Sequence, residues 1–306
     1  MAELEFRRIE ITDKQRAEEC LRKSNFRGCE YTFGNNYVWR NVYNVEVCFS
    51  HGMYFCKFGR GNDIKFNFPA GGGDVREAVE LIKEYCRENG IAPRIGANKQ
   101  IAELITAQYP EALAEYQRDL SDYVYLAEDL ETLKGKKYHG KRNHLNRFYE
   151  NDWNFEPMTP ENIPECIAMN ERWCEEENIT DCDVADDENE QSKREEQCIV
   201  RCSFKHFDEL GYVGGVLRVN GGVQAFTFGE PSASDCFVVH VEKALRDYQG
   251  AYTAVNAEFV KSLGGKFTYI NREEDTGAKN LRRAKLSYHP VFLEDKFDIT
   301  FGGNEK

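Results

Sequence analysis

The sequence predicts an α+β protein with two consecutive domains of one topology, each a mixed, mostly antiparallel sheet flanked by helices. Two tight-hairpin signals carry this prediction, His51-Gly52 and Asn220-Gly221, because each joins two runs rich in β-branched and aromatic residues. In both halves a third strand and then a helix follow the hairpin, and glycine precedes that helix. A repeated order of elements indicates a repeated fold.

The first domain is assigned to residues 1–135. Its main helix begins after three glycines at 71–73 and ends at Gly90, and Pro110 stops its second helix because proline cannot continue one. The predicted elements are, in order, strands at 45–50, 53–59 and 64–69, a helix at 71–90, a strand at 93–97, a helix at 98–110 and a strand at 121–129.

The second domain is assigned to residues 136–306 and repeats this order. Its main helix has apolar residues about one turn apart, and Gly264 can end it. The predicted elements are a helix from about 138, strands at 211–219, 222–230 and 235–242, a helix at 250–264, a strand at 267–271, a helix at 277–288 and strands at 290–294 and 297–301.

Composition narrows the class of protein. No window approaches the roughly 20 apolar residues that a membrane span needs, and the N-terminus lacks the apolar core of a secretory signal, so a cytoplasmic location is expected. The 11 cysteines include no C-x-x-C pair, which argues against a disulfide framework or a compact zinc site, and no metal is predicted. The acidic stretch 174–197 is interpreted as a solvated insertion.

A net charge of -13 argues against indiscriminate nucleic-acid coating, so no DNA partner is expected and a local basic patch stands out. On a helix from about residue 138, Lys137, Lys141 and His144 lie in one row at i, i+4 and i+7, with Arg142 next to Lys141. This row is a candidate site for tRNA phosphates. The alternative is a solvated helix face that binds nothing.

The order hairpin, strand, helix resembles that of the acyl-CoA N-acyltransferase (GNAT) superfamily, in which the helix start binds pyrophosphate. Gly250 in the stretch DYQGAY lies at the matching place. Asp247 and Tyr252 depart from the cation-friendly and small residues that the superfamily uses there. Coenzyme A thioester is therefore kept as the alternative donor.

Two further segments carry a closer resemblance. LKGKKYHGKRNHLNRF at 133–148 and GAKNLRRAKLSYHP at 277–290 are similar to motifs of the C-terminal domain of phosphatidylglycerol lysyltransferases, in particular of a soluble bacterial branch. The resemblance implies a pair of GNAT-like domains, also used by Fem peptidyltransferases, with aminoacyl-tRNA as co-substrate and no bound cofactor. Because the lipid-modifying members carry a membrane domain that this chain lacks, the acceptor stays open.

Three residues are predicted to act in the reaction. His240 and Glu242 lie two apart on a strand and are expected on the same face, where they can transfer a proton or bind an ammonium. Lys285 is expected to face an anion together with Arg282, three residues away on a short helix. The alternatives are a structural pair in the sheet and a helix end whose cations complement its own dipole.

Tyr252, Asn256 and Tyr288, together with Gly250 and Arg282, are assigned to substrate binding. The predicted function is transfer of an aminoacyl group from aminoacyl-tRNA to a lipid or to a small-molecule amine or hydroxyl. Two alternatives are an acyl-CoA-dependent N-acyltransferase and a non-catalytic protein that binds a nucleotide or an amino acid.

Overall fold

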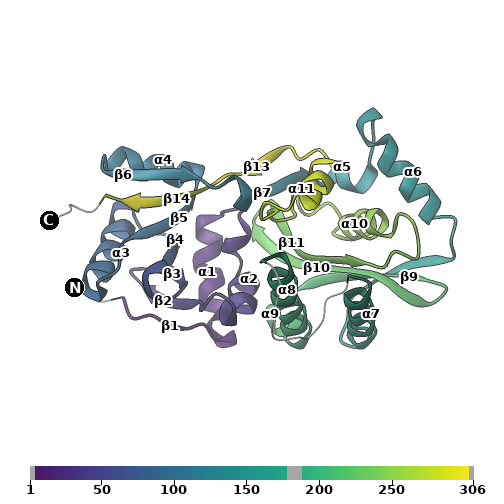
Figure 1. The fold of residues 1–306 in the computed structure, drawn as a ribbon, viewed down its shortest axis with the longest axis horizontal. Helices are drawn as coiled ribbons and strands as arrows, with labels where there is room; N and C mark the ends of the chain where they lie inside the picture. The colour runs from purple at the N-terminus through teal and green to yellow at the C-terminus, as the bar shows by residue number, and fades with distance from the viewer. Residues whose placement is uncertain (1–3, 178–187, 303–306) are drawn as a thin grey trace.

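The structure, a computed structural model, describes residues 4–177 and 188–302 and contains two seven-stranded sheets flanked by helices (Figure 1). The first sheet runs, in spatial order, β1 (Arg7–Arg8), β2 (Glu46–Ser50), β3 (Met53–Phe58), β4 (Lys65–Gly71), β5 (Arg94–Asn98), β14 (Lys296–Phe301) and β6 (Ala112–Tyr116). The second runs β13 (Phe292–Glu294), β7 (Asp122–Leu126), β12 (Tyr269–Asn271), β11 (Cys236–Ala244), β10 (Gly222–Ala233), β9 (Val213–Val219) and β8 (Trp153–Pro157). The predicted α+β class is confirmed.

The helices lie between and around these sheets. They are α1 (Lys14–Ser24), α2 (Phe33–Val38), α3 (Val75–Asn89), α4 (Lys99–Gln108), α5 (Ala127–Thr132), α6 (His139–Phe148), α7 (Ile163–Glu176), α8 (Glu188–Lys205), α9 (Phe207–Leu210), α10 (Ala251–Ser262) and α11 (Lys279–Leu286). Among the described residues, no helix combines the length and the apolar character that crossing a membrane requires. The predicted acidic insertion at 174–197 falls on the ends of α7 and α8 and on residues outside the described ranges.

Both sheets have the same topology. Four antiparallel strands are followed by a fifth that runs parallel to the fourth, with α3 or α10 as the crossover helix. The sixth position in each sheet is filled from the other half of the chain: β14 lies between β5 and β6, and β7 lies between β12 and β13. The repeated order is thus confirmed, and the two halves also exchange one strand each. The boundary at residue 135 stays a prediction about folding units, although β7, which precedes it, belongs to the second sheet.

Local sequence signals explain the crossover helices and the turns. Asp74 accepts hydrogen bonds from the backbone N–H groups of Arg76 and Glu77 and so caps the start of α3. Both hairpin dipeptides have positive φ at both residues, for example 50° at Asn220 and 81° at Gly221, which is the turn that matches the twist of the strands. The two predicted hairpins are confirmed.

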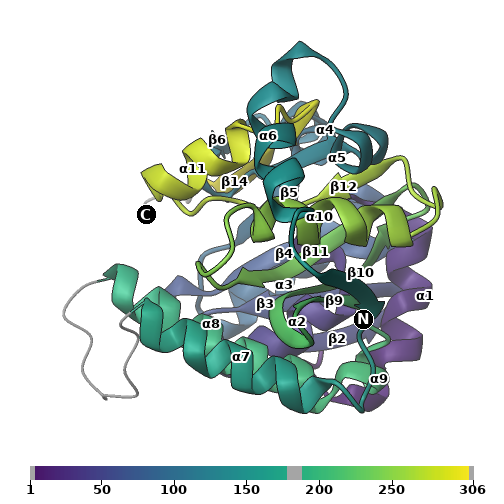
Figure 2. The same ribbon diagram turned by 90° about the vertical axis from the view of Figure 1, so that its right-hand side faces the viewer.

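Three apolar cores hold the structure together. One lies under α3 and α4 on the first sheet, and another lies under α5, α6 and α10 on the second. The third joins α1 and α2 to α7, α8 and the opposite face of the second sheet, so both halves contribute to it. Figure 2 shows α7 and α8 on one side of β10 and β11, and α10 with α5 and α6 on the other. Trp173 of α7 lies in this third core.

Candidate functional site

The parallel strands β11 and β12 diverge after a short paired stretch. Their register ends at the pair Val238 and Asn271, and the chain continues beyond both residues without further pairing between them. Ligands bind preferentially in the crevice outside the carboxyl ends of neighbouring parallel strands. We name the space beyond Val238 and Asn271 the strand crevice. The residues that follow, up to Glu242 on β11 and Glu274 after β12, supply its charged groups.

One ion pair bridges the strand crevice on the side of α10. The guanidinium Nη2 of Arg272 donates to Glu242 Oε1 at 2.7 Å, and Asn256 Nδ2 of α10 donates to Glu242 Oε2 at 3.0 Å. Two atoms of this group remain unused: among the described residues, Arg272 Nη1 and Asn256 Oδ1 are buried without a hydrogen-bond partner. Buried polar groups in proteins are almost always hydrogen-bonded. One donor and one acceptor are therefore available to a ligand.

Lys141 and Tyr288 complete this group. The Nζ of Lys141 lies 3.7 Å from the ring centroid of Tyr288, and the guanidinium carbon of Arg272 lies 4.7 Å from the same centroid. Burial lowers the pKa of Lys141 to about 8, and the neighbouring cation of Arg272 adds to this effect. The Tyr288 hydroxyl donates to Thr253 Oγ1 of α10 at 3.3 Å. The site thus holds a lysine that loses its proton around pH 8.

A second charged group bridges the strand crevice on the opposite face. His240 lies between two carboxylates, with Nδ1 at 2.7 Å from Glu273 and Nε2 at 3.0 Å from Glu230. Burial disfavours the charged ring, but these two hydrogen bonds outweigh it and raise the pKa of His240 to about 9. The imidazole is therefore a cation at neutral pH, and both of its nitrogens are occupied.

The prediction that His240 and Glu242 share one face is wrong, and a β-bulge is the reason. Phe228 and Gly229 of β10 are consecutive, but they pair with Val241 and Val239, so His240 is an extra residue in β11. The bulge shifts the alternation of side chains. His240 consequently faces Glu230 and the third core, whereas Glu242 faces α10.

Lys285 and Arg282 hold the segment that follows β12. The Nζ of Lys285 donates to the carbonyl oxygen of Arg272 at 2.6 Å and to that of Glu274, and burial lowers the pKa of this lysine. Arg282 makes two hydrogen bonds to Asp275, at 2.8 and 2.7 Å, and a third to Asp119 at 2.5 Å. The structure places Lys285 next to Arg272, whereas Arg282 lies with Asp275 and Asp119 outside the strand crevice.

Gly250 lies at the start of α10, where α6 covers it. Its φ is +98°, and a Cβ there would overlap the carbonyl oxygen of His144 and lie 3.2 Å from the Cβ of Phe148, both on α6. Tyr252 points toward α7, where its hydroxyl accepts a hydrogen bond from Trp173 Nε1 at 3.1 Å. Close packing of α6 thus accounts for this glycine.

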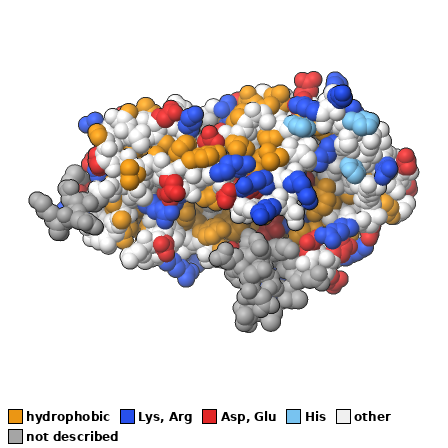
Figure 3. All heavy atoms as spheres, turned by 45° about the horizontal axis from the view of Figure 1, so that its top comes forward, with side chains coloured by type: hydrophobic (Ala, Val, Ile, Leu, Met, Phe, Trp, Pro, Cys, Tyr) orange, Lys and Arg blue, Asp and Glu red, His pale blue; other side chains and the backbone are white. Residues whose placement is uncertain are grey.

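The predicted row of three cations is divided by the structure. Lys137 pairs with Asp129 at 3.0 Å and is half exposed, with a 46% exposed side chain. Arg142 donates to the carbonyl oxygens of Leu133 and Gly135, the latter at 2.6 Å, and Lys141 points into the site. Figure 3 shows Lys and Arg side chains gathered over the middle of one face, with histidines beside them.

One further cluster has metal-ligand chemistry. Cys29, Glu30 and Asp122 have ligand atoms within 4.8 Å of one another. The Nζ of Lys296 already lies among them, at 2.7 Å from Asp122, 2.9 Å from Glu30 and 3.3 Å from the Cys29 sulfur. Because the lysine ammonium fills the position of a cation, we assign no metal to this cluster.

Comparison with known proteins identifies the family. The family model described as phosphatidylglycerol lysyltransferase, C-terminal, matches residues 21–300, and the chain belongs to this family. The resemblance seen in the sequence motifs is confirmed, and family membership supports an acyltransferase. No curated protein sequence matches the chain.

Solved structures share this fold. A conserved protein of unknown function from Bacteroides thetaiotaomicron is 33% identical, with a TM-score of 0.91 over 98% of this chain and 100% of that one. The C-terminal domain of a putative lysylphosphatidylglycerol synthetase from Agrobacterium fabrum has the same fold at 15% identity, with a TM-score of 0.67 over 95% of this chain and 92% of that one. L-PGS from Bacillus licheniformis follows, at 14% identity and a TM-score of 0.59 over 86% of this chain and 85% of that one.

Proposed function

We propose that this protein transfers an aminoacyl group from aminoacyl-tRNA to an amine or hydroxyl acceptor, a lipid or a small molecule, in the strand crevice. The main support is a pair of buried atoms without hydrogen-bond partners, Arg272 Nη1 and Asn256 Oδ1, in the same site as Lys141. An aminoacyl ester offers a carbonyl oxygen that becomes negative during transfer and an ammonium group that is positive throughout. A donor and an acceptor side by side complement these two groups.

The residues divide the reaction between them. Arg272 Nη1 stabilises the oxyanion, because a fixed cationic donor in a buried site acts on charge that develops in the transition state. Asn256 Oδ1 and the Glu242 carboxylate bind the ammonium of the aminoacyl group. Lys141 accepts the proton of the acceptor, for which a pKa of about 8 is well placed.

The chemical step needs no cofactor. The acceptor nitrogen or oxygen attacks the ester carbonyl and forms the new bond, while its proton passes to the neutral amine of Lys141. The oxyanion then collapses, the bond to the 3′-terminal ribose oxygen of the tRNA breaks, and Lys141 returns the proton to that oxygen. His240 and Lys285, which were predicted to act directly, are here positioning residues, since they hold Glu273 and the carbonyl oxygens beside Arg272.

The packing of α6 supports tRNA over coenzyme A as the source of the acyl group. A pyrophosphate would need the free N–H groups at the start of α10, and α6 backbone lies directly against Gly250 there. For the tRNA we propose contacts with exposed cations on and just before α6 and on α11. They are Lys134, Lys136, Lys137 and Arg147, and Lys279 and Arg283.

Binding at two salt concentrations tests the donor class. Aminoacyl-tRNA, deacylated tRNA and acetyl-CoA are titrated separately, and we expect charged tRNA to bind best and to weaken as salt rises. Binding of acetyl-CoA alone would overturn the tRNA donor. If none of the three binds, the protein is better explained as a binding module for another ligand.

Turnover tests the site. Transfer of a labelled amino acid to water-soluble amines and to lipid extracts is followed for wild type, Glu242→Gln and Arg272→Lys. In both variants the rate of transfer should fall at least a hundred-fold while the affinity for tRNA is kept, because Glu242 and Arg272 act on the aminoacyl end of the tRNA. Glu88→Gln, an exposed substitution on α3, is the matched control. Full transfer in Glu242→Gln and Arg272→Lys would refute the assignment.

A further inference from the structure

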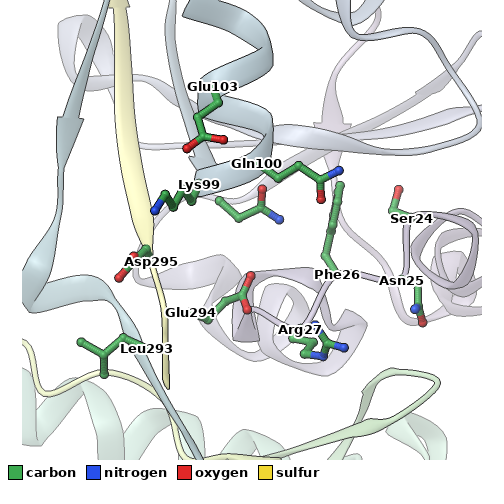
Figure 4. Close-up of a pocket in the computed structure, with 11 residues that line it drawn as sticks. Ser24, Asn25, Phe26, Arg27, Lys99, Gln100, Glu103, Leu293, Glu294 and Asp295 are labelled. Atoms are coloured by element: carbon green, nitrogen blue, oxygen red, sulfur yellow. The ribbon is translucent and has the colours of Figure 1, made fainter. Parts of the chain in front are cut away.

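A hollow of about 510 Å³ opens on the first half of the molecule, and none of its lining residues belongs to the charged groups of the strand crevice. It is lined by the end of α1 and the residues after it, by Asn98 and the first half of α4, and by the end of β13 with the residue that follows it (Figure 4). This hollow lies at the carboxyl end of β5, and β5 holds in the first sheet the position that β12 holds in the second. The two halves therefore place a cavity and the strand crevice at equivalent ends of equivalent strands.

Asn98, the last residue of β5, leaves a donor unused in this hollow. Its Oδ1 accepts the backbone N–H of Ile101 at 3.0 Å, which caps α4 and fixes which side of the amide is nitrogen. The residue is only 7% exposed, and no described residue accepts a hydrogen bond from its Nδ2. The corresponding strand end in the second sheet differs, since Asn271 Nδ2 donates to Asp122 at 2.8 Å and to the carbonyl oxygen of Arg27 at 2.8 Å.

Glu294 leaves an acceptor unused in the same hollow. Figure 4 shows its carboxylate pointing into the space between Lys99, Phe26 and Arg27. Within the described ranges this carboxylate has no hydrogen bond and no ion pair. Arg27 is already committed to Asp235, with contacts of 3.1 and 2.7 Å. Burial raises the pKa of Glu294 to about 7, and the neighbouring carboxylates of Glu30 and Asp122 add to this effect against the nearby cations of Arg27 and Lys296.

The opposite wall of the hollow carries groups that can bind an anion, beside the lining carboxylates of Glu103 and Asp295. The first backbone N–H groups of α4, a helix of 10 residues, open onto it at Lys99 and Gln100, and the Lys99 side chain is exposed with no ion pair among the described residues. Glu294 lies two residues before Lys296, which pairs directly with Asn98 across β14 and β5. The unused donor and the unused acceptor are thus close enough for one small molecule to meet both.

We propose that this hollow binds a free α-amino acid. The ligand carboxylate receives hydrogen bonds from Asn98 Nδ2 and from the start of α4 and pairs with Lys99, while the ligand ammonium binds the Glu294 carboxylate. Phe26 and Leu293 supply apolar surface for its side chain. The site is separate from the strand crevice, so the proposal does not depend on the proposed transfer reaction.

Calorimetric titration with the twenty common amino acids tests this proposal, with propionate and ethylamine as ligands that carry only one of the two charges. At least one amino acid should bind saturably, and neither propionate nor ethylamine should match it. Glu294→Gln and Asn98→Asp should each weaken this binding roughly ten-fold or more, because each removes one charge-assisted contact. Asn98→Asp keeps the oxygen that caps α4, so the helix start is preserved.

Two controls separate this hollow from the rest of the molecule. Glu88→Gln, on the exposed side of α3, and Glu242→Gln, in the strand crevice, should both bind the amino acid in this hollow as wild type does. Unfolding temperatures of Glu294→Gln and Asn98→Asp near that of wild type show that the fold is intact. The proposal is overturned if no amino acid binds, if both hollow variants bind like wild type, or if only Glu242→Gln loses binding.

Discussion

Replacement of Gly250 by alanine separates two reasons for a glycine at this place. The residue has φ +98°, and a Cβ would overlap the carbonyl oxygen of His144 on α6. Gly264, just beyond the other end of α10, has φ +64° and nothing within 4 Å of an added Cβ. Gly264→Ala therefore measures the backbone conformation alone, whereas Gly250→Ala adds the loss of close packing.

The magnitudes follow from these two geometries. A left-handed conformation costs a residue with a Cβ about 1–2 kcal/mol, so Gly264→Ala should lower the free energy of unfolding by about 1 kcal/mol. The overlap at Gly250 cannot be relieved by a side-chain rotation because the obstructing atom belongs to the backbone. Moving α6 away loosens Leu145 and Phe148, which are buried, and overpacking of this kind costs about 1–3 kcal/mol more. We expect a loss of about 3 kcal/mol in total for Gly250→Ala.

Urea denaturation of both variants, followed by circular dichroism, measures the two losses side by side. The same preparations are assayed for aminoacyl transfer, since α6 carries Lys141 into the site. Gly250→Ala should reduce transfer strongly under conditions in which it is still folded, and Gly264→Ala should keep it. Equal losses of stability in the two variants would refute the role of the α6 contact. The start of α10 would then again be a candidate site for the pyrophosphate of coenzyme A.

Three other predictions concern charge. Transfer should rise with pH up to about 8 and then level off, because only about a tenth of Lys141 is neutral at pH 7, and Lys141→Arg should be inactive at every pH. His240 has a folded pKa of about 9 against 6.5 unfolded, so its stabilisation is full below pH 6.5 and is lost as pH rises through 9. Between pH 6 and 9.5 the free energy of unfolding of wild type, measured by urea denaturation, should fall by up to about 3 kcal/mol relative to that of His240→Gln. If the difference in free energy between the two proteins stays constant over this range, the imidazole is not charged. Replacing Lys279 and Arg283 by alanine should reduce the slope of log affinity for tRNA against log salt by about 1.5, and an unchanged slope would exclude α11 from the contact.

The architecture was predictable where local signals are strong. A tight hairpin turn needs two residues with positive φ, and the dipeptide Asn220-Gly221 is typical of such a turn. The strand β6 and the helix α8 were not predicted, because β6 has one buried residue among five and α8 begins within the acidic stretch. The exchange of β7 and β14 cannot be predicted from local sequence, since both strands look alike whichever sheet they join.

The candidate site was predicted in part. Glu242, Asn256, Tyr288 and Lys141 were singled out, and the structure brings their side chains together around Arg272, which was missed. The signal for Arg272 was its position directly after a short strand, at the carboxyl end that faces a crevice. The bulge at His240 was not predictable, because one extra residue in a strand leaves no mark in an alternating pattern.

The exchanged strand β7 supports one wall of the strand crevice. β12 has only three residues, and it is paired on its outer side by β7 from the first half of the chain. Tyr123 of β7 donates its hydroxyl hydrogen to Asp275 at 2.5 Å, and Arg118, just before β7, donates to Tyr123 at 2.8 Å. The segment that carries Arg272 is thus held from the first half of the chain as well as by Lys285. A buried donor without a hydrogen-bond partner persists only where its surroundings fix its position. The exchanged strand β7 contributes this support for Arg272, whose Nη1 has no partner among the described residues.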